Sequence, residues 1–318
     1  MKRDLKKIVS QMTLEEKAGM CSGLDFWHLK HVERLGIPEV MVSDGPHGLR
    51  KQDDKGDHLG MNDSIKAVCF PPAALSACSF DRKLMEEMGK TIGKEAQAND
   101  VSIVLGPAVN IKRSPLCGRN FEYYSEDPLI SGICAAAETQ GVQSHPGAGT
   151  TIKHFACNNL EDNRAYNNSH VTERTLREIY LKGFEIAIRK AQPLALMSSY
   201  NMLNGIHTAN SVDLLTKAAR QEWGFEGLIM TDWGTTAEPK PDLEGRMPLY
   251  GPSNAAACIK AGNDLLMPGS KEDVEEILAS VDAEEGTVKY PITLEELRGC
   301  AERILRIIAK SNTYTEES

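Results

Sequence analysis

The sequence lacks the features that place proteins in membranes, on nucleic acids or around nucleotides. No apolar run approaches the ~20 residues that a membrane-spanning helix needs. The formal net charge is −9 at pH 7, which argues against a nucleic-acid partner and suits a neutral substrate such as a sugar. Neither a complete Gly-x-x-x-x-Gly-Lys-Ser/Thr loop nor a strand followed by Gly-x-Gly-x-x-Gly occurs, which argues against nucleotide binding. Low-complexity tracts and internal repeats are also absent.

Signals for secretion and for metal binding are equally scarce. The basic N-terminus is not followed by the apolar stretch of a signal peptide. The eight cysteines are scattered and include no Cys-x-x-Cys pair, so we expect a reduced, cytoplasmic protein without disulfides. His28 and His31 have the spacing of two metal ligands on a helix, but no third ligand is evident. We therefore expect no metal and no other cofactor.

What the sequence does contain is an alternation of short apolar runs with amphipathic stretches. Helix starts are marked by capping boxes at Thr13 and Thr293, by Asp127-Pro128, and by Thr172, which opens a helix predicted to run to about Lys190. Strands are predicted over residues 39–43, 101–105, 150–154, 194–199, 227–232 and 263–267. Such repeated βα units predict a parallel sheet in a single α/β domain over residues 1–318.

Polar residues follow most of these predicted strands. Asp44, Asn110, His154, Tyr200 and Asp232 each stand at or just beyond the carboxyl end of one of them. Functional groups gathered at the carboxyl ends of many strands are typical of a (β/α)8 active face. We therefore predict a TIM-type (β/α)8 barrel, regular or irregular.

Asp232 is the most informative of these positions, because an apolar run delivers its carboxylate to a strand end beside Trp233. In isolation it is either a nucleophile or a polar cap on the next turn. A pyranose needs carboxylates, cations and imidazoles for its hydroxyls and an aromatic face for its C–H groups. The chain offers such a set in Asp44, Arg119, Lys153, His154, Arg164, Tyr200, Asp232 and Trp233.

Structural alternatives exist for several members of this set. Arg119 could form a structural ion pair with Glu122, since such pairs also perturb charge. Trp233 could be a core aromatic residue, and Tyr200 could satisfy the backbone of a loop. These readings stay open at the level of single residues.

Five motifs that occur together and in a fixed order favour the functional reading of these residues. Through them the sequence resembles the N-terminal barrel domain of family 3 glycoside hydrolases of the β-glucosidase type. The resemblance extends over nearly the whole chain. The motifs are 43–50 (SDGPHGLR), 118–128 (GRNFEYYSEDP), 153–155 (KHF), 199–201 (SYN) and 227–233 (GLIMTDW).

The resemblance implies a retaining β-glycosidase that acts on terminal β-D-glucosides or short β-glucan oligosaccharides. It implies that Asp232 is the nucleophile and that Asp44 binds distal sugar hydroxyls. Arg119, Lys153 and His154 then contact the middle hydroxyls and Arg164 orients the site. Tyr200 forms a hydrogen bond near the nucleophile and Trp233 forms a wall of the subsite.

A second carboxyl group is expected to be missing. In the resembled glucosidase branch, the acid/base is a glutamate of a C-terminal α/β-sandwich domain, for which residues 1–318 leave no room. In the branch acting on N-acetylglucosamine it is an Asp-x-His pair, which the loop at 157–164 (CNNLEDNR) lacks. Glu161, Asp162, Glu238 and Glu244 are conceivable substitutes. We expect an impaired isolated chain that pairs with a sandwich domain or with itself.

Three other functions remain to be weighed against a β-glucosidase barrel. The chain could be a catalytically silent glycan-binding subunit, or a barrel specific for β-xylosides or arabinosides. A barrel acting on phosphorylated substrates is disfavoured, because the glycine-rich phosphate loop expected late in such barrels is missing.

Overall fold

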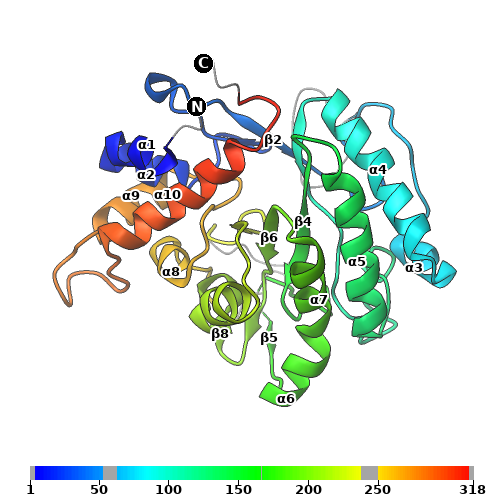
Figure 1. The fold of residues 1–318 in the computed structure, drawn as a ribbon. Coiled ribbons are helices and arrows are strands. Elements are labelled where there is room, and N and C mark those ends of the chain that lie inside the picture. The colour runs from blue at the N-terminus through cyan, green and yellow to red at the C-terminus, as the bar shows by residue number, and fades with distance from the viewer. Residues whose placement is uncertain (1–3, 53–62, 166, 238–249, 315–318) are drawn as a thin grey trace.

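The structure, a computed structural model, describes residues 4–52, 63–165, 167–237 and 250–314. Its centre is a six-stranded sheet in the order β1-β2-β3-β4-β6-β9 (Figure 1). All neighbours are parallel except β1, which runs antiparallel to β2. The strands are β1 (His28–Leu29), β2 (Val40–Ser43), β3 (Val101–Val104), β4 (Gly149–Phe155), β6 (Ala195–Ser198) and β9 (Leu228–Thr231).

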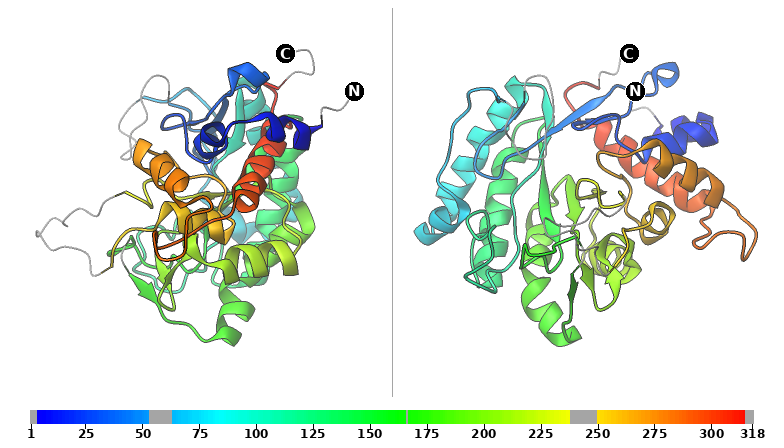
Figure 2. Two further views of the ribbon diagram at one scale, coloured as in Figure 1. Left: turned by 90° about the vertical axis from the view of Figure 1, so that its left-hand side faces the viewer. Right: turned by 180° about the vertical axis from the view of Figure 1, so that it is seen from behind.

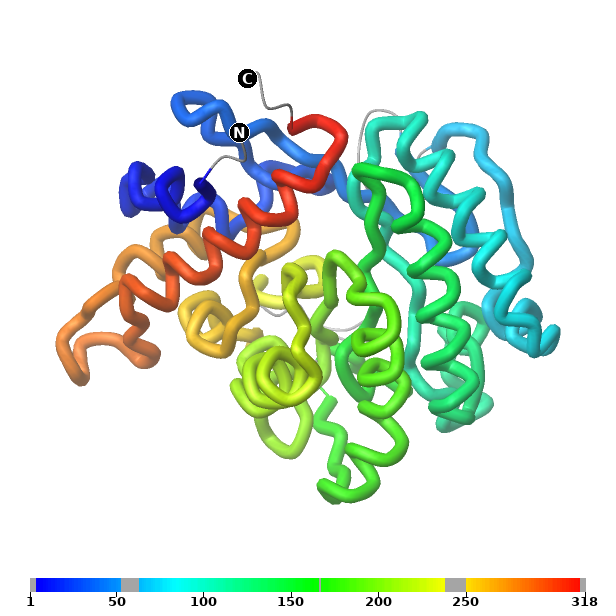
Figure 3. The backbone as a smooth tube through the Cα atoms, viewed as in Figure 1, coloured from blue at the N-terminus to red at the C-terminus, as the bar shows by residue number. Residues whose placement is uncertain are grey.

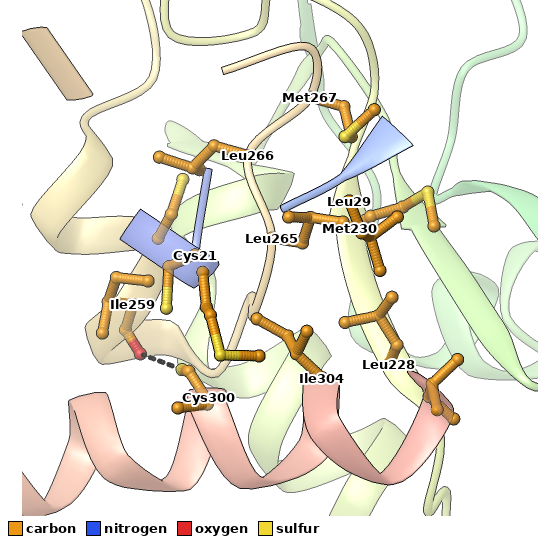
Figure 4. Close-up of a cluster of buried hydrophobic side chains, with 14 of the residues drawn as sticks. Cys21, Leu29, Leu228, Met230, Ile259, Leu265, Leu266, Met267, Cys300 and Ile304 are labelled. Atoms are coloured by element: carbon orange, nitrogen blue, oxygen red, sulfur yellow. Dashed lines mark hydrogen bonds between the residues drawn. The ribbon is translucent and has the colours of Figure 1, made fainter. Parts of the chain in front are cut away.

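Single bridges close this sheet on itself. Beyond β9, Met230 bridges Leu265, Leu266 bridges Ser22, and the adjacent Gly23 bridges Leu29 of β1. Figure 4 shows the core at this closure, where Leu29, Met230 and Leu265 lie near Ile304 of the C-terminal helix. The predicted TIM-type barrel is therefore confirmed, in an irregular form in which isolated bridges replace full strands on one side.

Helices surround the barrel. They are α1 (Leu5–Gln11), α2 (Leu14–Met20), α3 (Ala73–Ser76), α4 (Arg82–Ala98), α5 (Pro128–Gln143), α6 (Glu173–Thr175), α7 (Lys182–Ala191), α8 (Ala255–Ala261), α9 (Lys271–Ser280) and α10 (Leu294–Ile308). Short 3-10 turns are η1 (Glu33–Leu35), η2 (Ala77–Ser79) and η4 (Thr208–Asn210), and π-helical segments are η3 (Leu176–Tyr180) and η5 (Asp213–Glu222). None of the helices in the described ranges is long and apolar enough to cross a membrane.

Two helix groups flank the barrel on opposite sides (Figure 2). On one side α5 packs between α4 and α7. This packing is close, because a Cβ on Gly141 would lie 2.2 Å from the carbonyl oxygen of Glu86 in α4. On the other side α10 contacts α1, α2 and α8, so the C-terminal helix lies beside the N-terminal ones (Figure 3). The two groups cover the barrel with chain segments that are far apart in the sequence.

Most predicted elements are present with small changes. The sixth predicted strand, 263–267, provides only bridges, since the Met267 N–H bonds to Thr231 Oγ1 instead of a backbone carbonyl. Both capping boxes form, Asp127 caps α5, and Thr172 caps the helix that starts at Glu173. That helix contains the π-turn η3, closed by the bond from Leu181 N to Leu176 O at 2.9 Å. A π-turn shifts the helix faces, and Ile179 within this turn is 39% exposed.

A second, smaller sheet was not predicted. It joins β5 (Asn168–Ser169) to β7 (Met202–Leu203) and β8 (Ile206–His207). Its strands belong to the connections that follow β4 and β6, so it fixes the loops on the same face of the barrel as the polar strand ends.

Candidate active site

A cavity of about 690 Å³ opens at the carboxyl ends of the barrel strands. Every residue of the predicted site set lines it, namely Asp44, Arg119, Lys153, His154, Arg164, Tyr200, Asp232 and Trp233. Asp44 directly follows β2, Lys153 and His154 lie in β4, and Asp232 directly follows β9. The barrel thus brings together residues that are up to 189 positions apart (233 − 44) in the sequence.

Asp232 is held at the end of β9 with one carboxylate oxygen free. Its backbone N–H donates to Ser198 O at 3.1 Å, and its Oδ1 accepts from the N–H of Trp233 at 2.8 Å. Oδ2 is buried and has no hydrogen-bond partner among the described residues. Burial raises the pKa of Asp232, while Arg119 and Arg164 oppose that rise. The site therefore contains a desolvated carboxylate that nearby cations stabilise.

Arg119 belongs to two pairs at once. Its Nε donates to Glu122 Oε1, so the structural ion pair weighed above exists. Its Nη2 also lies 2.9 Å from Nε2 of His154. Burial lowers the pKa of Arg119, but the charges of Glu122, Tyr123 and Asp232 outweigh burial, so the pKa is raised overall. The guanidinium thus stays charged and links Glu122 to the centre of the site.

His154 is almost completely buried and is surrounded by cations. Its side chain is 2% exposed, and its Nε2 is 3.8 Å from Oδ2 of Asp232. Burial, followed by the charges of Arg119, Lys153 and Arg164, lowers the pKa of His154 well below its usual value. The imidazole is therefore neutral at physiological pH.

Lys153 and Asp44 face each other across the cavity floor. Lys153 Nζ is 3.7 Å from Asp44 Oδ1, and the lysine is buried whereas the aspartate is 36% exposed at its side chain. Asp44 is fixed through its backbone, because its carbonyl accepts from Arg50 N at 2.9 Å. This leaves the carboxylate of Asp44 facing open space with a cation behind it.

Arg164 and Tyr200 form the side of the cavity next to Asp232. The guanidinium of Arg164 lies 4.8 Å from the centroid of the Tyr200 ring, and its Nη1 donates to Glu161 Oε2 at 2.9 Å. The Tyr200 hydroxyl donates to Trp233 O at 2.7 Å. Burial, and then the charge of Asp232, raises the pKa of Tyr200 well above its usual value, so the phenol stays protonated.

Trp233 belongs to a wall of three aromatic side chains, of which the sequence predicted only Trp233 itself. Its Nε1 donates to Phe26 O at 2.9 Å, and its ring centroid lies 5.9 Å from that of Trp27. Phe26 and Trp27 also line the cavity. Trp233 is thus at once a core aromatic residue and a cavity wall. The signal available in the sequence was the Phe26-Trp27 pair, since tryptophan occurs only three times in the chain.

Two further residues of the site were missed as functional candidates. His47 lines the cavity, and its Nε2 accepts from the backbone N–H of Ala73 at the start of α3 at 3.0 Å. Asn110 is buried and bonds to the backbone of His154. His47 lies within the motif at 43–50, but nothing in the sequence alone indicates which residue Asn110 contacts.

Two of the conceivable substitutes for an acid/base, Glu161 and Asp162, do not line the cavity. Glu161 is bound to Arg164 and to Asn158, and neither Glu161 nor Asp162 is among the described residues that line the cavity. Glu238 and Glu244 lie outside the described residues.

The two histidines considered as metal ligands have partners of their own. His28 bonds to Asp25 at 2.9 Å, and His31 is 3.8 Å from Glu39. Within the described ranges no group of three or more His, Cys, Asp or Glu residues could hold a metal ion.

Comparison with known proteins identifies relatives of this chain. The sequence model described as "Glycosyl hydrolase family 3 N terminal domain" matches residues 29–307. Thermostable beta-glucosidase B of Acetivibrio thermocellus is 53% identical over 79% of this chain and 33% of its own length. An exo-alpha-(1->6)-L-arabinopyranosidase of Bifidobacterium breve is 44% identical over 86% of this chain and 34% of its own length. The chain thus spans about a third of the length of these relatives.

A solved structure shows the same fold. Beta-glucosidase 3B from Thermotoga neapolitana in complex with alpha-D-glucose superposes with a TM-score of 0.83 at 38% identity. The match covers 97% of this chain and 43% of that one.

Proposed function

We propose that this chain, which belongs to glycosyl hydrolase family 3, forms one barrel domain that supplies the nucleophile and the sugar subsite of a retaining β-glucosidase. The observation that carries the proposal is the free, buried Oδ2 of Asp232 in a cavity ringed by Arg119, Arg164 and Lys153. Similarity to beta-glucosidases, one of them in complex with glucose, supports a β-glucoside as the substrate.

In this mechanism Asp232 Oδ2 attacks the anomeric carbon of the glucoside. A C–O bond forms to the carboxylate while the bond to the leaving oxygen breaks, and water then hydrolyses the glycosyl ester. Desolvation makes the carboxylate reactive, and the surrounding cations keep it ionised. Asp44 and Lys153 bind sugar hydroxyls, and the Trp233 wall packs against the C–H face of the ring.

The leaving oxygen also needs a proton, and we propose that the group that supplies it comes from outside the described residues. Of the described carboxylates in the cavity besides Asp232, Asp44 faces Lys153 and Glu122 is bound to Arg119. Both carboxylates are thus already paired with cations of the site. A sandwich domain or a partner chain could bring such a group. Exposed apolar side chains support such a contact; they are Phe121, which lines the cavity, and Leu75, Phe80 and Leu116 elsewhere on the surface.

A mechanism-based probe tests the nucleophile. With 2,4-dinitrophenyl 2-deoxy-2-fluoro-β-D-glucoside, whose leaving group needs little protonation, the chain should gain the mass of one fluoroglucosyl group. Peptide mapping should place it on Asp232, and Asp232→Ala should remain unlabelled. Absence of an adduct on the wild-type chain, or an adduct elsewhere, contradicts the proposal.

Specificity for an arabinoside is the second candidate, because the arabinopyranosidase is 44% identical to this chain. Comparing nitrophenyl β-D-glucoside, β-D-xyloside and α-L-arabinopyranoside as substrates decides between them. A silent glycan-binding subunit would bind glucose equally well with Asp232→Asn and form no adduct.

We also propose a cytoplasmic location, which the eight free thiols support.

A further inference from the structure

The side chain of Asn110 holds both the backbone and the ring of His154. Asn110 is buried, its Nδ2 donates to His154 O at 2.9 Å, and its Oδ1 accepts from His154 N at 2.8 Å. The same Oδ1 lies 3.4 Å from Nδ1 of the imidazole. A single amide therefore makes three contacts with the residue next to the candidate nucleophile.

The two backbone bonds fix which end of the amide faces the ring. A peptide carbonyl only accepts and a peptide N–H only donates, so the amide of Asn110 cannot be flipped. The atom beside the imidazole Nδ1 is therefore an oxygen, which accepts. A neutral imidazole has one proton, and this contact places it on Nδ1.

Arg119 imposes the same arrangement from the other side of the ring. Its Nη2, 2.9 Å from His154 Nε2, can only donate. Nε2 must therefore present its lone pair. Two independent contacts thus select one tautomer, with the proton on Nδ1 and the acceptor on Nε2.

This tautomer leaves the oxygen of the candidate nucleophile without a donor. His154 Nε2 is 3.8 Å from Asp232 Oδ2 and has no proton to offer it. The single proton of the Tyr200 hydroxyl is donated to Trp233 O. Oδ2 of Asp232 consequently keeps its lone pairs free, in agreement with its lack of partners among the described residues.

We propose that Asn110 is a positioning residue that fixes the tautomer of His154 and thereby keeps Asp232 Oδ2 free of hydrogen-bond donors. This inference rests on the proposed function of Asp232 for its consequence, but the tautomer itself does not depend on any activity. The charged groups that face the imidazole are Arg119, Lys153, Arg164 and Asp232.

The tautomer is measured by long-range ¹H–¹⁵N correlation spectra of the full chain labelled at histidine. Signals of His154 are assigned by their loss in His154→Gln. We expect a protonated Nδ1 and an unprotonated Nε2, unchanged from pH 6 to pH 8, because the pKa of His154 is well below its usual value. A wild-type spectrum with the proton on Nε2 overturns the inference without any variant.

The isosteric variant Asn110→Asp tests the role of the amide. It removes the donor to His154 O and puts a negative charge beside Nδ1, which favours the imidazolium. A protonated Nε2 should then appear between pH 6 and pH 8, and labelling by the fluoroglucoside should slow by about tenfold, the cost of one hydrogen bond to a charged group. Unchanged ring signals together with unchanged labelling contradict the inference.

Asn263→Asp is the matched control. Asn263 is also fully buried, but its Nδ2 donates to Ser198 Oγ at 3.0 Å and its bonds do not reach His154. It carries the same cost of a new buried carboxyl, so it should lower stability without altering the His154 signals. If wild-type protein shows the expected tautomer but forms no adduct, the proposed function fails and the tautomer assignment stands.

Discussion

Two buried aspartates at opposite ends of the last barrel strand show how differently one fold treats the same side chain. Asp232 follows the carboxyl end of β9, and Asp264 lies beside the other end, where its Oδ2 accepts from Ile229 N at 2.8 Å. Asp264 also accepts from Arg220 at 2.6 Å and from Arg303 at 2.7 Å, so both of its oxygens are bonded. Asp232 keeps one oxygen free.

The difference separates a carboxylate that holds the fold together from one that is available for chemistry. The bonds of Asp264 tie β9 to η5 through Arg220 and to α10 through Arg303. The cations around Asp232 act on it electrostatically, and its surroundings on balance raise its pKa. Loss of the charge on Asp264 should therefore lower stability, whereas loss of the charge on Asp232 should abolish its chemistry.

The largest effect is expected from Asp232→Asn. Labelling by the fluoroglucoside, and turnover of nitrophenyl glucoside where the wild-type chain shows it, should fall by at least about 10³-fold, because an amide is not a nucleophile. Since folding raises the pKa of Asp232, its ionised form opposes folding at pH 7, and the free energy of unfolding should stay constant or rise. Urea denaturation followed by tryptophan fluorescence gives that value.

A large loss of stability in Asp232→Asn contradicts the comparison. It would mean that Asp232 is needed to balance Arg119, Arg164 and Lys153, in the way that Asp264 balances its two arginines.

The opposite result is expected from Asp264→Asn. Arg220 and Arg303 would then lack their counter-charge in a buried place, and the free energy of unfolding should fall by about 3–5 kcal/mol. Below the unfolding transition, labelling of Asp232 should proceed at the wild-type rate. A slower rate in the still-folded protein, measured by mass spectrometry at 15 °C, would show that the two ends of β9 are coupled.

The sequence predicts the regular side of the barrel well and its closure poorly. The runs at 101–105 and 227–232 are short, rich in β-branched and aliphatic residues, and separated by helical segments. Such runs predict buried parallel strands, and both contain one in the structure. The run that contains Leu265 and Leu266 resembles these strands in sequence, but the two residues form only single bridges. The next ladder bond would need the N–H of Met267, which donates to the side chain of Thr231 instead. Such competition between side chain and backbone depends on tertiary neighbours and leaves no periodic signal.

The site shows the same limit at the level of single residues. Motifs identify which residues gather in the cavity, since Asp44, Lys153 and Asp232 lie at strand ends. They do not reveal that Arg119 also contacts His154, or that Asn110 contacts His154. These contacts join the connection that follows β3 to strand β4, and the partners become evident only in three dimensions.

A third buried carboxyl, Glu138 in α5, sharpens the comparison because its hydrogen-bond partner is the phenol of Tyr124 and not a cation. Burial raises the pKa of Glu138 to about 8, although Tyr124 donates to it. The protonated form stabilises the fold, so stability from this group is complete below pH 4.5 and is lost as the pH rises toward 8. Between pH 5 and pH 7 the free energy of unfolding of the wild-type protein should fall by about 1–3 kcal/mol relative to that of Glu138→Gln. Parallel pH profiles of the two proteins in urea denaturation would contradict a neutral Glu138.

The smallest effect is expected at the start of α10, the helix that supplies Arg303 to Asp264. Thr293 caps this helix, and its Oγ1 accepts from Glu296 N at 3.1 Å within a complete capping box. Thr293→Ala should lower the free energy of unfolding by about 1 kcal/mol, whereas Thr293→Ser keeps the cap and should cost only a few tenths of that. Labelling of Asp232 should be the same in both variants, because loss of the cap loosens only the half of the barrel that Asp264 holds together. If Thr293→Ala is as stable as Thr293→Ser, the first turn of α10 does not take part in the cooperative unfolding of that half.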